Sequence, residues 1–214
     1  MTSPTPGSND WLAQVIEPIE DPAREIIDPH HHLWRNRFNQ DYLLNELWAD
    51  TGAGHNVTKT VFMECRAFYR REGPEHLQAL GETQTITEIA KKSHENNEGR
   101  AQIAGIVAHA DLTLAGTEKE KLVELLDGHT AIAGALFKGI RQAGARDSEP
   151  EALVIPGSAP AYLYGKESFR EGLRLLAARG LSYDTWHYHH QNLDYIDLAN
   201  AVPECTMVLD HFGT

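Results

Sequence analysis

The sequence predicts an α/β fold of the (β/α)8 TIM-barrel type, incomplete, with about six of the eight βα units present. Two observations support this prediction. Short apolar, β-branched runs alternate with segments of helical spacing, which is the pattern of βα units around a parallel sheet. Polar residues suited to chemistry also recur at the carboxyl ends of the predicted strands, where catalytic groups gather in barrel enzymes.

Six strands are predicted, and their nearly continuous apolar runs are typical of strands covered on both faces. In chain order they span residues 26–30, 58–65, 101–108, 135–141, 181–186 and 206–211. Apolar residues at helical spacing predict helices over residues 74–97, 117–128, 168–180 and 194–202. The competing architecture is a doubly wound open sheet. It is disfavoured because no Gly-x-Gly-x-x-Gly turn follows the first strand.

Composition narrows the class of protein. Hydrophobic residues make up 41% of the 214 residues and charged residues 23%, as in ordinary globular proteins. The net charge of −12 argues against a nucleic-acid partner, because phosphate binding needs clustered Lys and Arg. No run of about 20 apolar residues is present, so no membrane partner is expected. Cys65 and Cys205 are too few for a disulfide framework and fit a reducing compartment, so a cytoplasmic location is expected.

Two regions are expected along the chain. Residues 1–24 are predicted to be a leader, partly disordered, and residues 25–214 to form the barrel domain. The first ten residues are rich in Ser, Thr, Pro and Gly. They lack the basic segment and apolar core of a signal peptide.

Three consecutive histidines end the first predicted strand. Strand alternation places His30 and His32 on one face and His31 on the other, where it is expected to be structural. A His-x-His pair at a strand end can direct two imidazoles at one metal ion, or at one substrate carboxylate or carbonyl. Asp28 shares their face and is a candidate acceptor for a ring N–H.

Three other strand ends bear candidate site residues. The guanidinium of Arg141 suits bidentate recognition of a carboxylate, or an ion pair with Glu64. Glu64 either orients the paired histidines or pairs with Arg141. His109 lines the mouth of the barrel, or caps the following helix together with Asp111.

The segment IIDPHHHLW resembles the first-strand signature of the amidohydrolase superfamily, in the amidohydrolase-related (amidohydrolase 2) branch. That branch includes sugar lactonases, 2-pyrone-4,6-dicarboxylate lactonase and nonoxidative decarboxylases. FMECRAFYR, LQALGET, GIVAHADL, FKGIRQ, YDTWHYHHQ and VLDHFG resemble its later blocks in the same order. The resemblance runs from about residue 26 to the C-terminus and implies a predicted TIM-barrel metal-dependent hydrolase, or a metal-independent lactonase.

The resemblance also implies a cofactor, a divalent metal ion and most often zinc. Its ligands would be His30, His32 and His189 through neutral imidazole nitrogens. In metal-free lactonases the same histidines contact the substrate instead. Neighbouring His187 and His190 leave the register of this assignment open, because a slip of one residue exchanges the two faces.

The remaining matched residues receive catalytic or substrate-binding roles. His211 is expected to polarise a carbonyl or assist proton transfer, and Glu64 is the second catalytic candidate. Arg141, Tyr188 and His109 are the substrate-binding candidates.

The implied activity is the opening of a lactone or cyclic ester of a small organic or sugar acid by an activated water. The expected partner is a small, carboxylate-bearing substrate, and a homodimer is a further expectation. A nonoxidative decarboxylase of the same fold and an inactive truncated fragment are the alternatives. One departure favours the fragment. In the family, an aspartate at the end of the eighth strand acts as general base or metal ligand, and no residue here matches it, so a C-terminally truncated member is expected.

Overall fold

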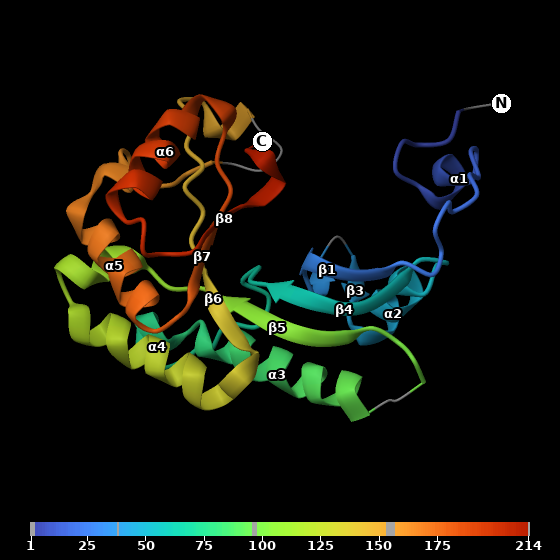
Figure 1. Cartoon of the computed structure of the whole chain (residues 1–214), viewed down its shortest axis with the longest axis horizontal. Coiled ribbons are helices and arrows are strands. Elements are labelled where there is room, and N and C mark those ends of the chain that lie inside the picture. The colour runs from blue at the N-terminus through green and yellow to red at the C-terminus, as the bar shows by residue number, and fades with distance from the viewer. Residues whose placement is uncertain (1–2, 38, 96–97, 153–156, 214) are drawn as a thin grey trace.

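The computed structural model of the chain describes residues 3–37, 39–95, 98–152 and 157–213. Its main feature is a six-stranded parallel sheet in the order β1-β4-β5-β6-β7-β8, which curls into a half-barrel (Figure 1). The strands of this sheet are β1 (Glu25–His31), β4 (Asn56–Met63), β5 (Gln102–Ala108), β6 (Phe137–Arg141), β7 (Ser182–Thr185) and β8 (Met207–Leu209). The predicted fold class, an incomplete barrel, is confirmed.

Four helices follow four of these strands, as predicted. They are α3 (Leu80–Glu95), α4 (Lys119–Ala133), α5 (Glu167–Ala178) and α6 (Asn192–Ala201). Each predicted strand and helix overlaps an observed one, with boundaries that shift by a few residues at most except at the start of α3. There the predicted helix began at residue 74, and the chain instead forms a short 3-10 turn, Glu75–Leu77, before the α-helix.

Several short elements were not predicted. They are α1 (Asn9–Leu12) within the expected leader, the antiparallel pair β2 (Trp34–Arg37) and β3 (Gln40–Tyr42), and α2 (Leu44–Thr51). The β2–β3 hairpin has left-handed backbone at Asn36 (φ 48°) and Asn39 (φ 59°). Asparagine adopts this conformation more readily than other non-glycine residues, which suits it to such turns. These elements are too short for an apolar period to reveal them.

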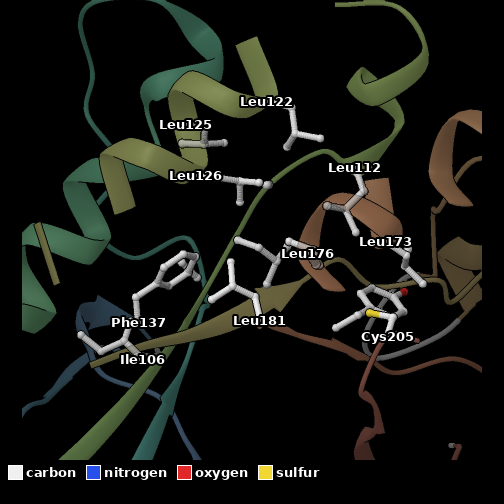
Figure 2. Packing of buried hydrophobic residues seen from close by; sticks show 14 of the residues in the cluster. Ile106, Leu112, Leu122, Leu125, Leu126, Phe137, Leu173, Leu176, Leu181 and Cys205 are labelled. Atoms are coloured by element: carbon white, nitrogen blue, oxygen red, sulfur yellow. The ribbon is translucent and has the colours of Figure 1, made fainter. Parts of the chain in front are cut away.

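The hydrophobic core lies between the convex face of the sheet and the helices that cover it (Figure 2). Ile106 of β5 and Phe137 of β6 are buried against Leu122 and Leu126 of α4, and Leu176 of α5 continues this layer. Burial of each such side chain contributes roughly 1.5–3 kcal/mol of hydrophobic free energy. Cys205 packs in the same cluster, and both cysteines are free thiols.

The parallel sheet brings all its carboxyl ends to one edge. The register aligns Arg141 of β6 with Asp184 of β7, and Thr185 of β7 with Leu209 of β8. Residues at or just beyond these ends are therefore neighbours in space although they are distant in sequence. No helix of the described residues has the length and apolar composition of a membrane span.

Candidate functional site

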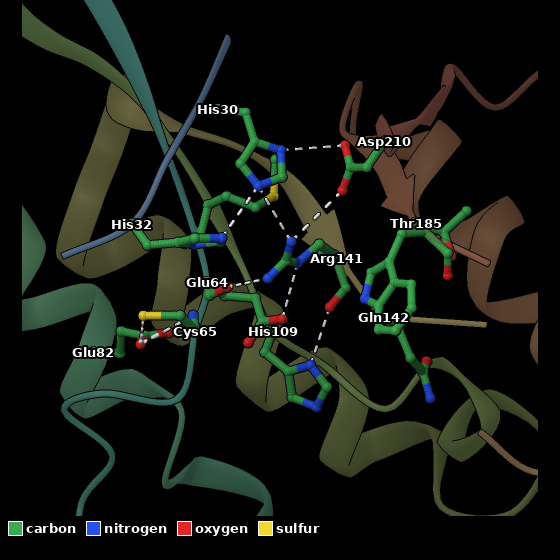
Figure 3. A network of polar contacts seen from close by, with 12 residues as sticks. His30, His32, Glu64, Cys65, Glu82, His109, Arg141, Gln142, Thr185 and Asp210 are labelled. Carbon is green, nitrogen blue, oxygen red and sulfur yellow. Dashed lines mark hydrogen bonds and ion pairs between the residues drawn. The ribbon is translucent and has the colours of Figure 1, made fainter. Parts of the chain in front are cut away.

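Five polar residues meet at the carboxyl edge of the sheet (Figure 3). His30 and His32 come from the end of β1, Glu64 follows β4, Arg141 ends β6 and Asp210 follows β8. The first four were predicted to belong to one site, and the structure brings them together. Asp210 was not predicted.

Arg141 lies at the centre of the cluster. Its Nε donates to Oε1 of Glu64 over 3.0 Å, and its Nη2 donates to the backbone oxygen of Glu64. Its Nη1 lies 3.6 Å from Oδ2 of Asp210, an ion-pair distance. Taken as whole residues, all three are at most 7% exposed. One buried cation therefore faces two carboxylates, and the ion-pair alternative for Arg141 is the one observed.

The two histidines direct their Nε2 atoms at each other across 3.2 Å. Nδ1 of His32 lies 2.8 Å from the backbone oxygen of Met63. A carbonyl only accepts, so this nitrogen carries the hydrogen and Nε2 of His32 keeps its lone pair. Burial lowers the pKa of His32 to about 4, so its ring is neutral at neutral pH. His30 approaches Asp210 through Nδ1 at 3.6 Å and Nη1 of Arg141 through Nε2 at 3.5 Å.

The spacing of the two Nε2 atoms suits a zinc ion. Zinc–nitrogen bonds of about 2.0–2.1 Å in tetrahedral geometry separate two ligand nitrogens by about 3.3 Å. The observed 3.2 Å between His30 and His32 matches one edge of such a tetrahedron. Among the described residues, however, no group of three or more His, Cys, Asp or Glu has the geometry of a complete metal site.

His31 and Asp28 occupy structural positions. His31 points away from the cluster, as alternation predicts, and its ring meets that of Phe62 edge-on at 5.9 Å. Burial lowers the pKa of His31 to about 3. Asp28 accepts a hydrogen bond at Oδ1 from the backbone N–H of His30 over 3.0 Å. Asp28 thus fixes the strand end, and the carboxylate that faces a ring nitrogen of His30 is that of Asp210, at 3.6 Å.

The turn after β8 places Asp210 and His211 differently. Asp210 is 6% exposed and faces the cluster, whereas His211 is exposed, with its ring centroid 4.8 Å from that of His30. His211 and Phe212 both have left-handed backbone with φ of 56°. Two such non-glycine residues in succession are strained, and strain of this kind clusters at functional sites. The sequence signal for Asp210 was an acid directly after an apolar strand.

The structure does not bring His189 or Tyr188 to the cluster. His189 is exposed, and its ring contacts that of His190 at 5.8 Å. Tyr188 is half-buried between Trp186 and His190. His187 is the histidine that turns inward at this strand end. Its Nδ1 lies 3.0 Å from the hydroxyl of Tyr164 and its Nε2 lies 2.9 Å from Oδ1 of Asn192, which ties it to the local packing.

His109 lies behind Arg141. Its Nδ1 donates to the backbone oxygen of Arg141 over 3.0 Å, and burial lowers its pKa. It lines a separate cavity of about 660 Å³ with Tyr69. The helix-capping role belongs to Asp111 alone, which accepts from the backbone N–H of Thr113 over 3.0 Å. His109 thus supports the backbone that presents the guanidinium.

Glu82 of α3 fixes the loop that bears Glu64. Its Oε1 accepts hydrogen bonds from the backbone N–H groups of Ala67 over 2.7 Å and Cys65 over 3.3 Å. Burial raises the pKa of Glu82 to about 7. The helix therefore holds the strand-end loop in place through a carboxyl that titrates near neutral pH.

A cavity of about 360 Å³ opens on the concave side of the sheet beside the cluster. His30, Asp210 and His211 line it from two of the strand ends, together with Lys138 of β6 and Asp184 of β7. Its size is within the range of small-molecule sites. Of the cluster, His30 and Asp210 therefore face a cavity large enough for a small ligand.

A comparison with models of known protein families finds no match. The chain is 29% identical over 217 residues to the uncharacterized protein y4mH of Sinorhizobium fredii, a match that covers 88% of this chain and 62% of that protein. The chain thus spans less than two thirds of this relative's length.

Several solved structures are similar to the chain. An amidohydrolase of Burkholderia multivorans with bound zinc has a TM-score of 0.59 at 20% identity, over 88% of this chain and 58% of that one. Amidohydrolase 2 from Bifidobacterium longum subsp. infantis has a TM-score of 0.55 at 18% identity, over 88% and 62%. These similarities show the fold: the chain has the fold of the amidohydrolase structures over most of its length.

Proposed function

We propose that this chain is a hydrolase of the amidohydrolase-related family that opens a lactone or cyclic ester of a small carboxylate-bearing acid by attack of an activated water. One observation supports this most strongly: the Nε2 atoms of two imidazole rings lie 3.2 Å apart at the carboxyl edge of the sheet. That edge is where barrel enzymes place their chemistry. The shared fold of the amidohydrolase structures supports the reaction class.

The pKa of His32 determines what its ring can do. With a pKa of about 4, the ring is a weak base at neutral pH and does not hold a proton that it removes from water. Its Nε2 is suited to accept a hydrogen bond or to ligate a metal. His30 and His32 would be the two protein ligands of a zinc ion. Such an ion would polarise the ring carbonyl and lower the pKa of bound water.

Other residues of the cluster would act on the substrate. Nε and Nη2 of Arg141 are bonded to Glu64, whereas Nη1 makes only the two longer contacts of 3.5 and 3.6 Å. In our proposal Nη1 meets a substrate oxygen while Glu64 holds the guanidinium plane. His211, exposed at the rim of the cavity, would take the proton that the attacking water loses and pass it to the leaving oxygen as the ring C–O bond breaks.

Assay of a panel of sugar-acid and dicarboxylic-acid lactones tests the proposal. Titration of released acid in a pH-stat should detect ring opening by the zinc-loaded chain. His30→Ala should abolish that activity, and the control His189→Ala should retain it, because His189 is exposed and apart from the cluster. Release of CO2 from the acids without ring opening would assign a nonoxidative decarboxylase instead. No turnover of either kind would leave the chain an inactive fragment and refute the proposal.

A further inference from the structure

We infer that Asp210 is a positioning residue that decides which ring nitrogen of His30 carries the hydrogen. Only the effect of Asp210 on catalysis rests on the proposed function. The contacts that Asp210 makes are read directly from the structure. Oδ1 of Asp210 lies 3.6 Å from Nδ1 of His30, and Oδ2 lies 3.6 Å from Nη1 of Arg141.

An ionised carboxylate is an acceptor on both oxygens. Oδ1 of Asp210 therefore favours the form of His30 that carries its hydrogen on Nδ1. Nη1 of Arg141, a donor, lies 3.5 Å from Nε2 of His30 and favours a lone pair at that nitrogen. These two neighbours act on opposite ring nitrogens and favour the same form of the ring, whereas the lone pair of His32 at 3.2 Å favours the other form.

Without this selection His30 would have a competing arrangement. A hydrogen on Nε2 of His30 would point at the lone pair of His32 and form an internal hydrogen bond over 3.2 Å. Neither Nε2 lone pair would then be available to bind a ligand. Asp210 opposes this arrangement, so its role is to keep the two Nε2 lone pairs available together.

The backbone after β8 holds Asp210 in its buried position. Asp210 is followed by left-handed residues at His211, Phe212 and Gly213, with φ of 56°, 56° and 73°. Only glycine adopts this conformation without strain. The strained turn begins directly after Asp210 and leaves its carboxylate buried, while His211 and Phe212 are exposed.

Asp210→Asn is the decisive variant. Its side chain has one oxygen and one NH2 group. Because the guanidinium of Arg141 requires an acceptor, the oxygen should turn to Arg141 and the NH2 group to Nδ1 of His30. Nδ1 must then accept, and the hydrogen moves to Nε2. A triad aspartate changed to asparagine imposes the wrong histidine tautomer in the same way, which is a known example of this effect.

The readout is the long-range ¹H–¹⁵N spectrum of ¹⁵N-histidine-labelled, metal-free protein at pH 7.5. In the wild-type chain His30 should show a protonated Nδ1 and an unprotonated Nε2. In Asp210→Asn the two patterns should exchange, while His32, held by Met63, keeps its own. The matched control is Asp184→Asn, which removes another buried carboxylate of the same cavity and should leave both rings unchanged.

Wild-type spectra alone can overturn the inference. A wild-type His30 with its hydrogen on Nε2 contradicts it, whether or not the asparagine variant folds. An unchanged His30 pattern in a folded Asp210→Asn protein also contradicts it. Because the measurement needs neither metal nor turnover, the expected exchange in a chain without lactonase activity would refute the proposed function and leave the positioning role intact.

Discussion

Arg141 and Glu64 form a buried ion pair between two strand ends that are 77 positions apart in the sequence. Nε of Arg141 donates to Oε1 of Glu64 over 3.0 Å, and both side chains are 9% exposed. Asp210 adds a second carboxylate to the same guanidinium. The pair links β4 to β6 and, through Asp210, to β8, so the arrangement of the site across three strands depends on one cation.

Removal of that cation should destabilise the fold strongly. Arg141→Leu leaves the buried carboxylates of Glu64 and Asp210 without their cation, and loss of one member of a buried pair costs roughly 3–5 kcal/mol. Urea unfolding followed by circular dichroism measures the free energy. The control is Arg24→Leu, which breaks an exposed pair with Asp21 and should cost less than about 1 kcal/mol. Equal losses in the two variants would contradict the role of Arg141.

Zinc retention should depend on the paired histidines. In the double variant His30→Ala/His32→Ala both converging nitrogens are gone, so the chain should lose the zinc that the wild type retains after dialysis. Elemental analysis by mass spectrometry measures the metal per chain. His189→Ala should retain zinc, since His189 lies apart from the pair. Unchanged zinc in the double variant would refute these ligands.

Stability should fall as the pH falls below about 6.5. His129 is buried between the hydroxyl of Thr83 and the backbone oxygen of His109, and burial lowers its pKa to about 4. The unfolded chain binds the proton first, near pH 6.5, so stability is lost progressively from there down to pH 4. Between pH 6.5 and 5 this residue alone should cost about 2 kcal/mol. The buried rings of His31 and His32 act in the same direction.

Glu82 acts in the opposite direction. Its pKa is raised to about 7, so its contribution to the stability of the fold is complete below the unfolded value near 4.5 and is lost as the pH rises through 7.

Urea unfolding of wild type and variants at pH 7 and pH 5 separates the effects of His129 and Glu82. His129→Gln should reduce the loss on acidification by about 2 kcal/mol, whereas the exposed control His55→Gln should not change it. An identical pH dependence in wild type and His129→Gln would count against this assignment.

Self-association should follow from the strand edges of the half-barrel. In the described sheet β1 and β8 each have one neighbour, and unpaired edges template further pairing. Ile27 on β1 is 54% exposed and Val208 on β8 is 42% exposed. Light scattering after gel filtration should show dimers or larger species that grow with concentration. Ile27→Lys and Val208→Lys should suppress them, since charges on an edge oppose pairing. A monodisperse wild-type monomer at every concentration would exclude this behaviour.

Much of the fold and part of the site were predictable from local pattern. Apolar runs and helical spacing depend on neighbours along the chain, so the six strands and four main helices could be placed before the structure. Alternation of two faces is equally local. It correctly separated His31 from His30 and His32.

Beyond the strand ends, alternation no longer applies. The backbone angles after β8 decided that Asp210, rather than His211, is buried in the cluster. The chain after β7 turned His187 inward and left His189 exposed, a choice of register that periodicity had left open.

By itself, the sequence determined the barrel-type α/β architecture and the shared face of His30 and His32, because strand and helix periods are properties of a continuous segment. Only the tertiary structure decided which side chains of the site contact one another. It showed that Arg141 is held by Glu64 and Asp210 and that His30 faces Asp210. These contacts join residues from separate βα units. Their geometry depends on the curvature of the sheet and on the turns after each strand, which no local pattern encodes.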